Sequence, residues 1–224
     1  MLLLPDRKTM TKHGKFITFE GPEGGGKSTQ IRRLASRLEA AGHRVLVTRE
    51  PGGTPTGEAI RQILQHDVTG ESICAEAELL LFEASRAQLV RHVIQPALEQ
   101  GVWVLCDRFM DSTTAYQGYG RGFDVEAVLG INRFAVAGCE PDLTLLLDIE
   151  TQKGLVRLEG RNRREKTGND RIEREATAFH ERVRAGFLQL AHKWPARIRI
   201  VDAMRAEEEV EAMVWEAVLE ALKP

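Results

Sequence analysis

A glycine-rich stretch at residues 21–28 constrains the fold of this chain more than any other feature. It reads GPEGGGKS and fits the phosphate-binding P-loop pattern G-x-x-x-x-G-K-[ST]. An apolar segment at residues 15–20 precedes it, and residues 29–41 carry apolar side chains at helical spacing. A strand, a glycine loop and a helix in this order predict a phosphate-binding unit, whereas a plain glycine-rich turn would not require the lysine and serine.

The residue types of this loop suit the chemistry of a bound nucleotide. Glycines let backbone N–H groups approach phosphate oxygens closely, and the following helix adds the positive end of its dipole. We expect Lys27 to reach the β- and γ-phosphates and the Ser28 hydroxyl to bind Mg²⁺. The residues predicted to bind the nucleotide are Gly21, Gly24, Gly25, Gly26, Lys27, Ser28 and Thr29.

Strand-like and helix-like segments alternate along the chain. Strands are predicted at residues 15–20, 44–48, 102–106, 143–147 and 198–201. Helices are predicted at 29–41, around 60–64, from about 73 to 93 with an interruption at Pro96, at 125–136, briefly from Thr151, at 172–194 and up to about 222. This order predicts an α/β fold with a doubly wound parallel sheet of about five strands flanked by helices, as in P-loop NTPases. Ligands of such sheets bind beyond the carboxyl ends of the strands.

Length and composition indicate one domain and give no sign of a nucleic-acid or membrane partner. The chain has 224 residues and a formal net charge of -2, with acidic and basic residues interspersed. No apolar run approaches the length of a membrane-spanning helix. Three cysteines without metal-ligand spacing fit a reducing cytoplasm. We expect residues 1–14 to be a flexible extension and residues 15–224 to form a single domain.

Two charged clusters follow predicted strands and should lie at the same edge of the sheet. Arg49 stands beside a Gly-Gly pair, where it could bind a phosphate or be an ordinary surface arginine of a turn. Asp107 and Arg108 close the third strand. Asp107 could hold Mg²⁺ opposite Ser28, and Arg108 could neutralise a transferring phosphoryl group. A surface ion pair of small energetic value is the alternative for these two residues.

A basic run at residues 157–166 lies between two predicted helices. Gly160 and Gly168 would let it bend, so residues 157–170 are a candidate for a mobile lid that closes over phosphates and excludes water. A solvated flexible loop is the alternative. The variable positions of the P-loop contain no arginine, and phosphoryl transfer profits from a cation beyond the P-loop lysine. A lid arginine would supply this cation, and spacing does not choose among Arg161, Arg163 and Arg164.

Several motifs occur in a characteristic order. They read FEGPEGGGKST at 19–29, TREPGGT at 48–54, DRF at 107–109, STTAYQG at 112–118, PDLTLLLD at 141–148 and DRIE at 170–173. In these motifs the chain resembles the thymidylate kinase family over residues 15–222. The P-loop without arginine and the arginine-rich lid resemble its bacterial subtype. The resemblance implies transfer of the γ-phosphoryl group of Mg·ATP to dTMP for dTTP synthesis, by a cytoplasmic homodimer.

The resemblance also implies roles for individual residues. Phe82 would stack on thymine and Arg86 would bind a thymine carbonyl; they lie four residues apart on a predicted helix and share a face. The remaining implied contacts are to the dTMP phosphate (Arg49, Arg108), the sugar 3′-hydroxyl (Glu23), the N3 edge of the base (Thr113, with Gln117 close by), the sugar 2′ position (Tyr116), and Mg²⁺ with the acceptor phosphate (Asp107). A ring at the 2′ position would disfavour a ribonucleotide.

Two other functions remain open on the sequence. A kinase of the same fold could act on another nucleoside monophosphate, and the base- and sugar-facing residues argue against it. A non-catalytic ATP-binding switch would need no acceptor pocket, so the cluster formed by Arg49, Phe82, Arg86 and Arg108 argues against it. The sequence contains no N-K-x-D motif of the kind that reads guanine in GTPases.

Overall fold

The computed structural model describes residues 14–66, 70–165, 168 and 170–224. Its centre is a sheet in which all neighbouring strands run parallel, in the order β2-β3-β1-β4-β5. The strands are β1 (Phe16–Glu20), β2 (Val45–Arg49), β3 (Trp103–Asp107), β4 (Leu143–Asp148) and β5 (Ile198–Asp202). The predicted doubly wound sheet is confirmed, and each strand end lies within one residue of its predicted place.

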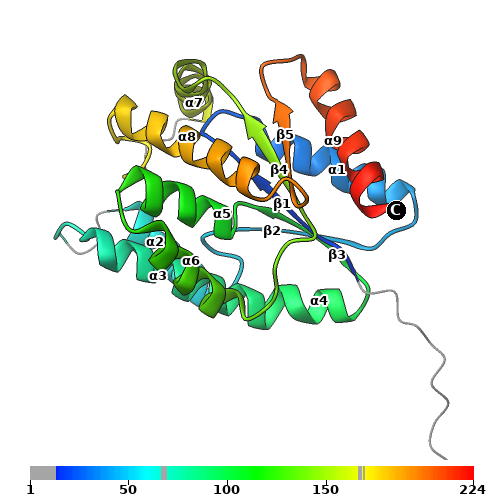
Figure 1. The fold of residues 1–224 in the computed structure, drawn as a ribbon, viewed down its shortest axis with the longest axis horizontal. Coiled ribbons are helices and arrows are strands. Elements are labelled where there is room, and N and C mark those ends of the chain that lie inside the picture. The colour runs from blue at the N-terminus through cyan, green and yellow to red at the C-terminus, as the bar shows by residue number, and fades with distance from the viewer. Residues whose placement is uncertain (1–13, 67–69, 166–167, 169) are drawn as a thin grey trace, which may run out of the picture.

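Helices cover both faces of the sheet, which explains why its central strands β1 and β3 are almost completely buried and mostly apolar (Figure 1). Helices α1 (Lys27–Ala40) and α9 (Glu207–Leu222) lie together on one face. Ile17 and Phe19 of β1 join the apolar core on that face, whereas Phe16 joins the core on the opposite face. Side chains of one strand therefore alternate between two cores, as the period of a strand requires.

The opposite face carries a long helical segment that changes its winding before a proline. Helix α3 (Ala75–Leu89) passes into a π-helical turn, η1 (Val90–Ile94), and then into α4 (Gln95–Glu99). Pro96 stands in the first turn of α4, but Ile94 and Gln95 before it are also helical. The sequence predicted a kink or an interruption at Pro96; the helical segment instead remains continuous from residue 75 to residue 99 and changes its winding in the turn before the proline.

The segments that follow β2 and β3 along the chain are helical. After β2, α2 (Pro55–Gln65) is capped by the Thr54 hydroxyl, which accepts a hydrogen bond from the Gly57 N–H at 2.9 Å. After β3, the chain forms α5 (Met110–Thr113) and a second π-helical segment, η2 (Thr114–Gly120), neither of which the sequence indicated. Helix α6 (Val125–Val136) has the predicted bounds.

Two predicted helix boundaries are wrong. Helix α7 (Thr151–Glu165) was expected to be short, but it extends to Glu165, beyond Arg161, where the charged segment was expected to interrupt it. Helix α8 (Thr177–Lys193) begins later than residue 172, because Ala176 directly before it is extended, with a ψ angle of 150°. Residues 171–174 form a separate turn, in which Asp170 Oδ1 accepts hydrogen bonds from the N–H groups of Ile172 and Glu173.

The beginning of the chain lies mostly outside the described residues. The predicted flexible extension comprises residues 1–14, and residues 1–13 of it are not described. Gly14 is buried and donates a hydrogen bond to the carbonyl of Leu98 at 2.9 Å. Among the described residues, no helix is long and apolar enough to span a membrane.

Candidate active site

The P-loop forms a tight turn between β1 and α1. Gly21, Gly24 and Gly26 have φ angles of 129°, 73° and 82°, which are accessible to glycine but strained for other residues. Lys27 folds back into the loop, and its Nζ donates to the carbonyls of Gly21 at 3.1 Å and Pro22 at 2.9 Å. Burial and the neighbouring Arg108 lower the pKa of Lys27 to about 8.

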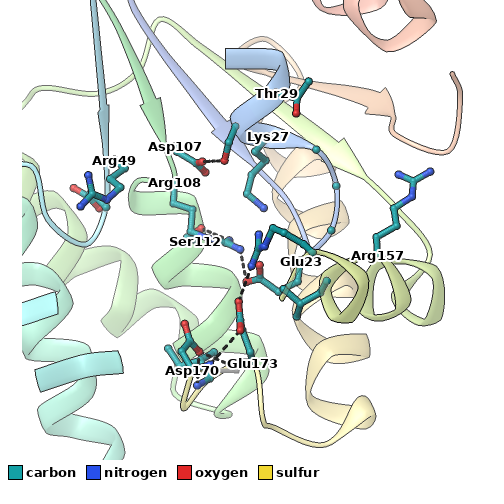
Figure 2. A pocket seen from close by; sticks show the side chains of 18 of the residues that line it. Glu23, Lys27, Thr29, Arg49, Asp107, Arg108, Ser112, Arg157, Asp170 and Glu173 are labelled. Carbon is teal, nitrogen blue, oxygen red and sulfur yellow. Dashed lines mark hydrogen bonds and ion pairs between the residues drawn. The ribbon is translucent and has the colours of Figure 1, made fainter. Parts of the chain in front are cut away.

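A cavity of about 1000 Å³ opens at the carboxyl ends of the strands and brings most of the predicted residues together. Figure 2 shows Lys27, Asp107, Arg108 and Glu23 around this hollow. The predicted residues that line it are Glu23, Gly24, Gly25, Gly26, Lys27, Ser28, Thr29, Arg49, Phe82, Arg86, Asp107, Arg108, Thr113, Tyr116, Gln117, Arg161 and Arg164.

Two predicted residues do not line the cavity. Gly21 contributes its carbonyl, which accepts from Lys27 and from Arg108 at 3.1 Å. The side chain of Arg163 is 83% exposed and pairs with Glu159 at 3.6 Å, on the same helix. Of the three candidate arginines, Arg161 and Arg164 line the cavity and Arg163 does not.

Oxygen atoms suited to a magnesium ion meet between the P-loop and β3. The Ser28 hydroxyl donates a hydrogen bond to Asp107 Oδ2 at 2.9 Å. A hydroxyl and a carboxylate are the hard oxygen ligands that Mg²⁺ prefers, and the ion usually takes only one or two protein ligands beside phosphates and water. Within the described residues, no three His, Cys, Asp or Glu side chains gather at a place that could hold a metal ion.

Arg108 occupies a strained position at the end of β3. Its φ is 67°, in the left-handed region, and Glu20 fixes the turn by accepting from the Phe109 N–H at 2.8 Å. Its guanidinium donates to Glu23 Oε1 and, at 3.1 Å, to Ser112 Oγ. Burial opposes the charge of Arg108, but Glu23, Tyr116 and the nearby carboxylates together outweigh burial, so the pKa of Arg108 is raised.

Glu23 is ionised because its neighbours are cationic. Burial alone would raise its pKa, but Arg108 and Lys27 lower the pKa of Glu23 to about 2. Tyr116 also donates its hydroxyl proton to Glu23 Oε1 at 3.0 Å. Glu23, Arg108 and Tyr116 thus form one hydrogen-bonded group at the cavity wall, where a sugar hydroxyl would meet a carboxylate.

Arg86 is buried, with 1% of its side chain exposed. Its Nε and Nη2 donate to Glu50 Oε2 at 2.9 and 2.6 Å, and its Nη1 donates to Glu83 at 2.5 Å. Two further bonds reach Asn132 Oδ1 at 2.8 Å and Thr113 Oγ1 at 3.0 Å. Composition alone would make Arg86 a solvated helix residue. The structure instead buries Arg86 in a network that joins α3, α5 and α6, while Phe82 is half-buried.

Sequence reasoning missed Arg61, which lines the cavity from α2 near Arg49. Its Nη1 donates to the carbonyl of Pro51 at 3.0 Å, and burial together with Arg49 lowers its pKa. Arg49 itself pairs with Glu58 at 2.9 Å. A usable signal existed, because Glu58 and Arg61 are charged residues on the helix that directly follows the Arg49 turn.

The comparisons with known proteins agree with this geometry. A family model described as thymidylate kinase matches residues 19–214. The chain belongs to the thymidylate kinase family. A thymidylate kinase of Syntrophotalea carbinolica is 52% identical over 201 residues, covering 89% of this chain and 93% of the relative. A thymidylate kinase of Deinococcus radiodurans is 50% identical over 207 residues, covering 92% of this chain and 97% of the relative.

A solved structure extends the thymidylate kinase assignment to the fold. The crystal structure of thymidylate kinase from Ehrlichia chaffeensis matches with a TM-score of 0.72 and 33% sequence identity. The match covers 92% of this chain and 99% of that chain. The α/β architecture with five parallel strands is therefore that of the thymidylate kinase family.

Proposed function

We propose that this chain transfers the γ-phosphoryl group of ATP to dTMP, giving dTDP and ADP, with Mg²⁺ in the cytoplasm. One observation carries the proposal: a single cavity is lined by the P-loop at one end and by Arg49, Phe82 and Tyr116 at the other. A donor nucleotide and an acceptor nucleotide would thus meet end to end. The thymidylate kinase relatives supply the identity of the acceptor.

Catalysis in this site is mainly alignment and charge neutralisation. The attacking atom is an oxygen of the dTMP phosphate, which is already anionic, so no strong general base is needed. Lys27 and Arg108 both donate to the Gly21 carbonyl, so they would place two neighbouring positive charges at the reacting phosphates. Mg²⁺, held by Ser28 and Asp107, would add positive charge at the phosphates of ATP.

Helix α7 is proposed to act as the lid. Arg161 and Arg164 line the cavity from this helix, and Arg161 donates to Glu173 Oε1 at 3.1 Å. Glu173 belongs to the segment that returns from the lid. When phosphates occupy the cavity, their charge competes with Glu173 for Arg161 and draws α7 over the reacting groups, which excludes water.

A homodimer is proposed through the outer faces of α3 and α6, which pack against each other. Leu80 of α3 is 57% exposed and Phe134 of α6 is 87% exposed. Large apolar side chains on adjoining exposed helices are typical of an interface, and dimers of identical chains are the commonest assembly.

Separation of the reaction products tests the transfer reaction. With Mg·ATP and dTMP, chromatography should show dTDP and ADP forming in equal amounts. ADP formation that does not depend on a monophosphate, without dTDP, would instead support an ATP-binding switch.

A further inference from the structure

Glu78 connects α3 with Gln117 at the cavity, with Arg121 and with Arg171, although it lies outside every motif of the sequence. It stands on α3 with 1% of its side chain exposed. Its Oε1 accepts from Gln117 Nε2 at 2.9 Å and from Arg121 Nε at 3.1 Å. Its Oε2 accepts from Arg121 Nη2 at 3.1 Å and from Arg171 Nη2. Four hydrogen bonds thus converge on one buried carboxylate.

The charge of Glu78 decides the orientation of the Gln117 amide. Burial alone would raise its pKa, but hydrogen bonds from Arg121 and Gln117 outweigh burial, so the pKa of Glu78 is lowered. An ionised carboxylate only accepts hydrogen bonds, so the amide nitrogen of Gln117 must face Glu78. The amide oxygen of Gln117 then points away from Glu78.

The Gln117 oxygen is available to a ligand. Gln117 lines the cavity, and its Oε1 accepts no hydrogen bond from the residues that the structure describes. The nearby Thr113 hydroxyl is held as a donor, whereas the Gln117 oxygen is held as an acceptor. Thr113 Oγ1 accepts from Arg86 Nη2 at 3.0 Å, which leaves the Thr113 hydroxyl proton free to donate. The cavity wall therefore presents one acceptor, which Glu78 orients, and one donor, which Arg86 orients.

We propose that Glu78 is a positioning residue that holds Gln117 with its carbonyl oxygen toward the base of the acceptor nucleotide, so that the cavity favours a base with a ring N–H at that edge. This inference rests on the proposed function, in which the acceptor is a pyrimidine nucleotide. Thymine carries a hydrogen on N3 beside a carbonyl. Cytosine in the same pose would set the N3 lone pair against the Gln117 oxygen, and two acceptors facing each other in a buried site are unfavourable.

Replacing Glu78 by glutamine tests the inference, because a neutral amide of the same shape lets Gln117 flip. The Glu78→Gln variant should lower the ratio of kcat/KM for dTMP to kcat/KM for dCMP by about tenfold or more. A merely structural role would lower both values together and leave the ratio unchanged, and that result would overturn the proposal.

Arg171→Gln is the matched control. It removes another partner of Glu78 and a bond to the Leu64 carbonyl at 3.2 Å, but it leaves the contact between Glu78 and Gln117 in place. Its turnover is expected to fall while its ratio of dTMP to dCMP stays near that of the unaltered protein. A ratio that falls as far as in Glu78→Gln would assign the effect to the lid segment and contradict the proposal.

A second variant keeps the test decisive if Glu78→Gln does not fold. Gln117→Met retains the two arginine partners of Glu78 and removes the amide oxygen, so kcat/KM should fall for dTMP much more than for dCMP. Full discrimination in Gln117→Met would overturn the proposal. Failure of the unaltered protein to form dTDP at all would instead be a failure of the proposed function.

Discussion

The surroundings of Lys27 disfavour the positive charge of its side chain. The ammonium group is buried beside Arg108, and only loop carbonyls and nearby carboxylates favour its protonation. The site therefore holds a cation whose electrostatic cost is relieved when phosphates arrive. Binding energy for ATP and sensitivity to pH both follow from this single residue.

The pKa of Lys27, lowered to about 8, predicts an alkaline decline in activity. Below this pH the side chain is charged; above it, the free enzyme loses the cation that binds ATP phosphates. We expect kcat/KM for ATP to fall as pH rises through about 8, while kcat, which reports the ATP complex, falls at higher pH. Residual activity of Lys27→Arg should lack this decline, since arginine stays charged. A flat profile up to pH 10 in the unaltered protein would contradict the assignment.

Removal of the Lys27 charge should abolish most of the rate. Lys27→Ala is expected to lower kcat by about 10²–10³-fold or more, because one preorganised cation at the transferring group is lost. Circular dichroism should show an unchanged fold and thermal transition. Near-normal turnover in the folded variant would remove Lys27 from the mechanism.

The residues of the site differ in how far the sequence could predict them. Lys27 and Ser28 were predictable, because a contiguous motif with suitable flanks fixes both position and chemistry. The environment of Arg86 was not, because its partners Glu50 and Asn132 are distant in the chain and meet it only in the folded state. Arg163 could not be separated from its neighbours until the helix phase of α7 was known.

At the level of elements, the P-loop and α7 touch backbone to backbone. A Cβ atom added at Gly154 of α7 would lie 2.4 Å from the carbonyl oxygen of Glu23, and one added at Gly24 would lie 2.2 Å from the carbonyl oxygen of Gly154. Neither neighbour is a flexible side-chain end, so the loop would have to shift. The lid helix and the phosphate loop are therefore coupled through glycines.

This contact predicts a pair of contrasting substitutions on one helix. Gly154→Ala should raise KM for ATP and lower the free energy of unfolding by about 1–3 kcal/mol. Gly160→Ala is the control, since a Cβ there meets no atom within 4 Å and alanine favours a helix. Its stability, measured by urea unfolding, should rise by up to about 1 kcal/mol. Equal effects of the two variants would refute the contact.

The lid arginines can be separated in the same way. Arg161→Ala and Arg164→Ala together should lower kcat by about 10²-fold or more with a much smaller change in dTMP affinity, because a transition-state cation is lost. Arg163→Ala, which alters an exposed side chain outside the cavity, should behave like the unaltered protein. Loss of dTMP affinity in the double variant, or a severe defect in Arg163→Ala, would argue against this role of α7.

The elements were more predictable than their ends near the lid. Strands were found to within one residue because buried parallel strands are short apolar runs bounded by turn residues. The run from Arg161 to Glu165 resembled a loop because it contains no apolar residue and follows Gly160, although it is helical. The later start of α8 depends on the extended backbone of Ala176, which no periodicity reveals.

At the scale of the whole molecule, the exposed apolar residues predict an assembly. Phe134→Glu should convert a dimer to a monomer in light-scattering measurements, because a charge would be buried at the proposed interface without a partner. Leu219→Glu is the control; Leu219 is 45% exposed on α9, away from α3 and α6, and this variant should remain dimeric. A monomeric unaltered protein would contradict the dimer.

One cavity is proposed to bring ATP and dTMP together, and the residues at its acceptor end select the base and the sugar of the monophosphate. The most direct test is ADP formation from Mg·ATP with dTMP, dUMP, UMP, CMP, AMP or GMP offered in turn. We expect strong stimulation by dTMP, weaker stimulation by dUMP and almost none by the ribonucleotides. Stimulation mainly by another monophosphate would contradict the roles of Phe82, Arg86 and Tyr116, and stimulation by none would contradict the acceptor site itself.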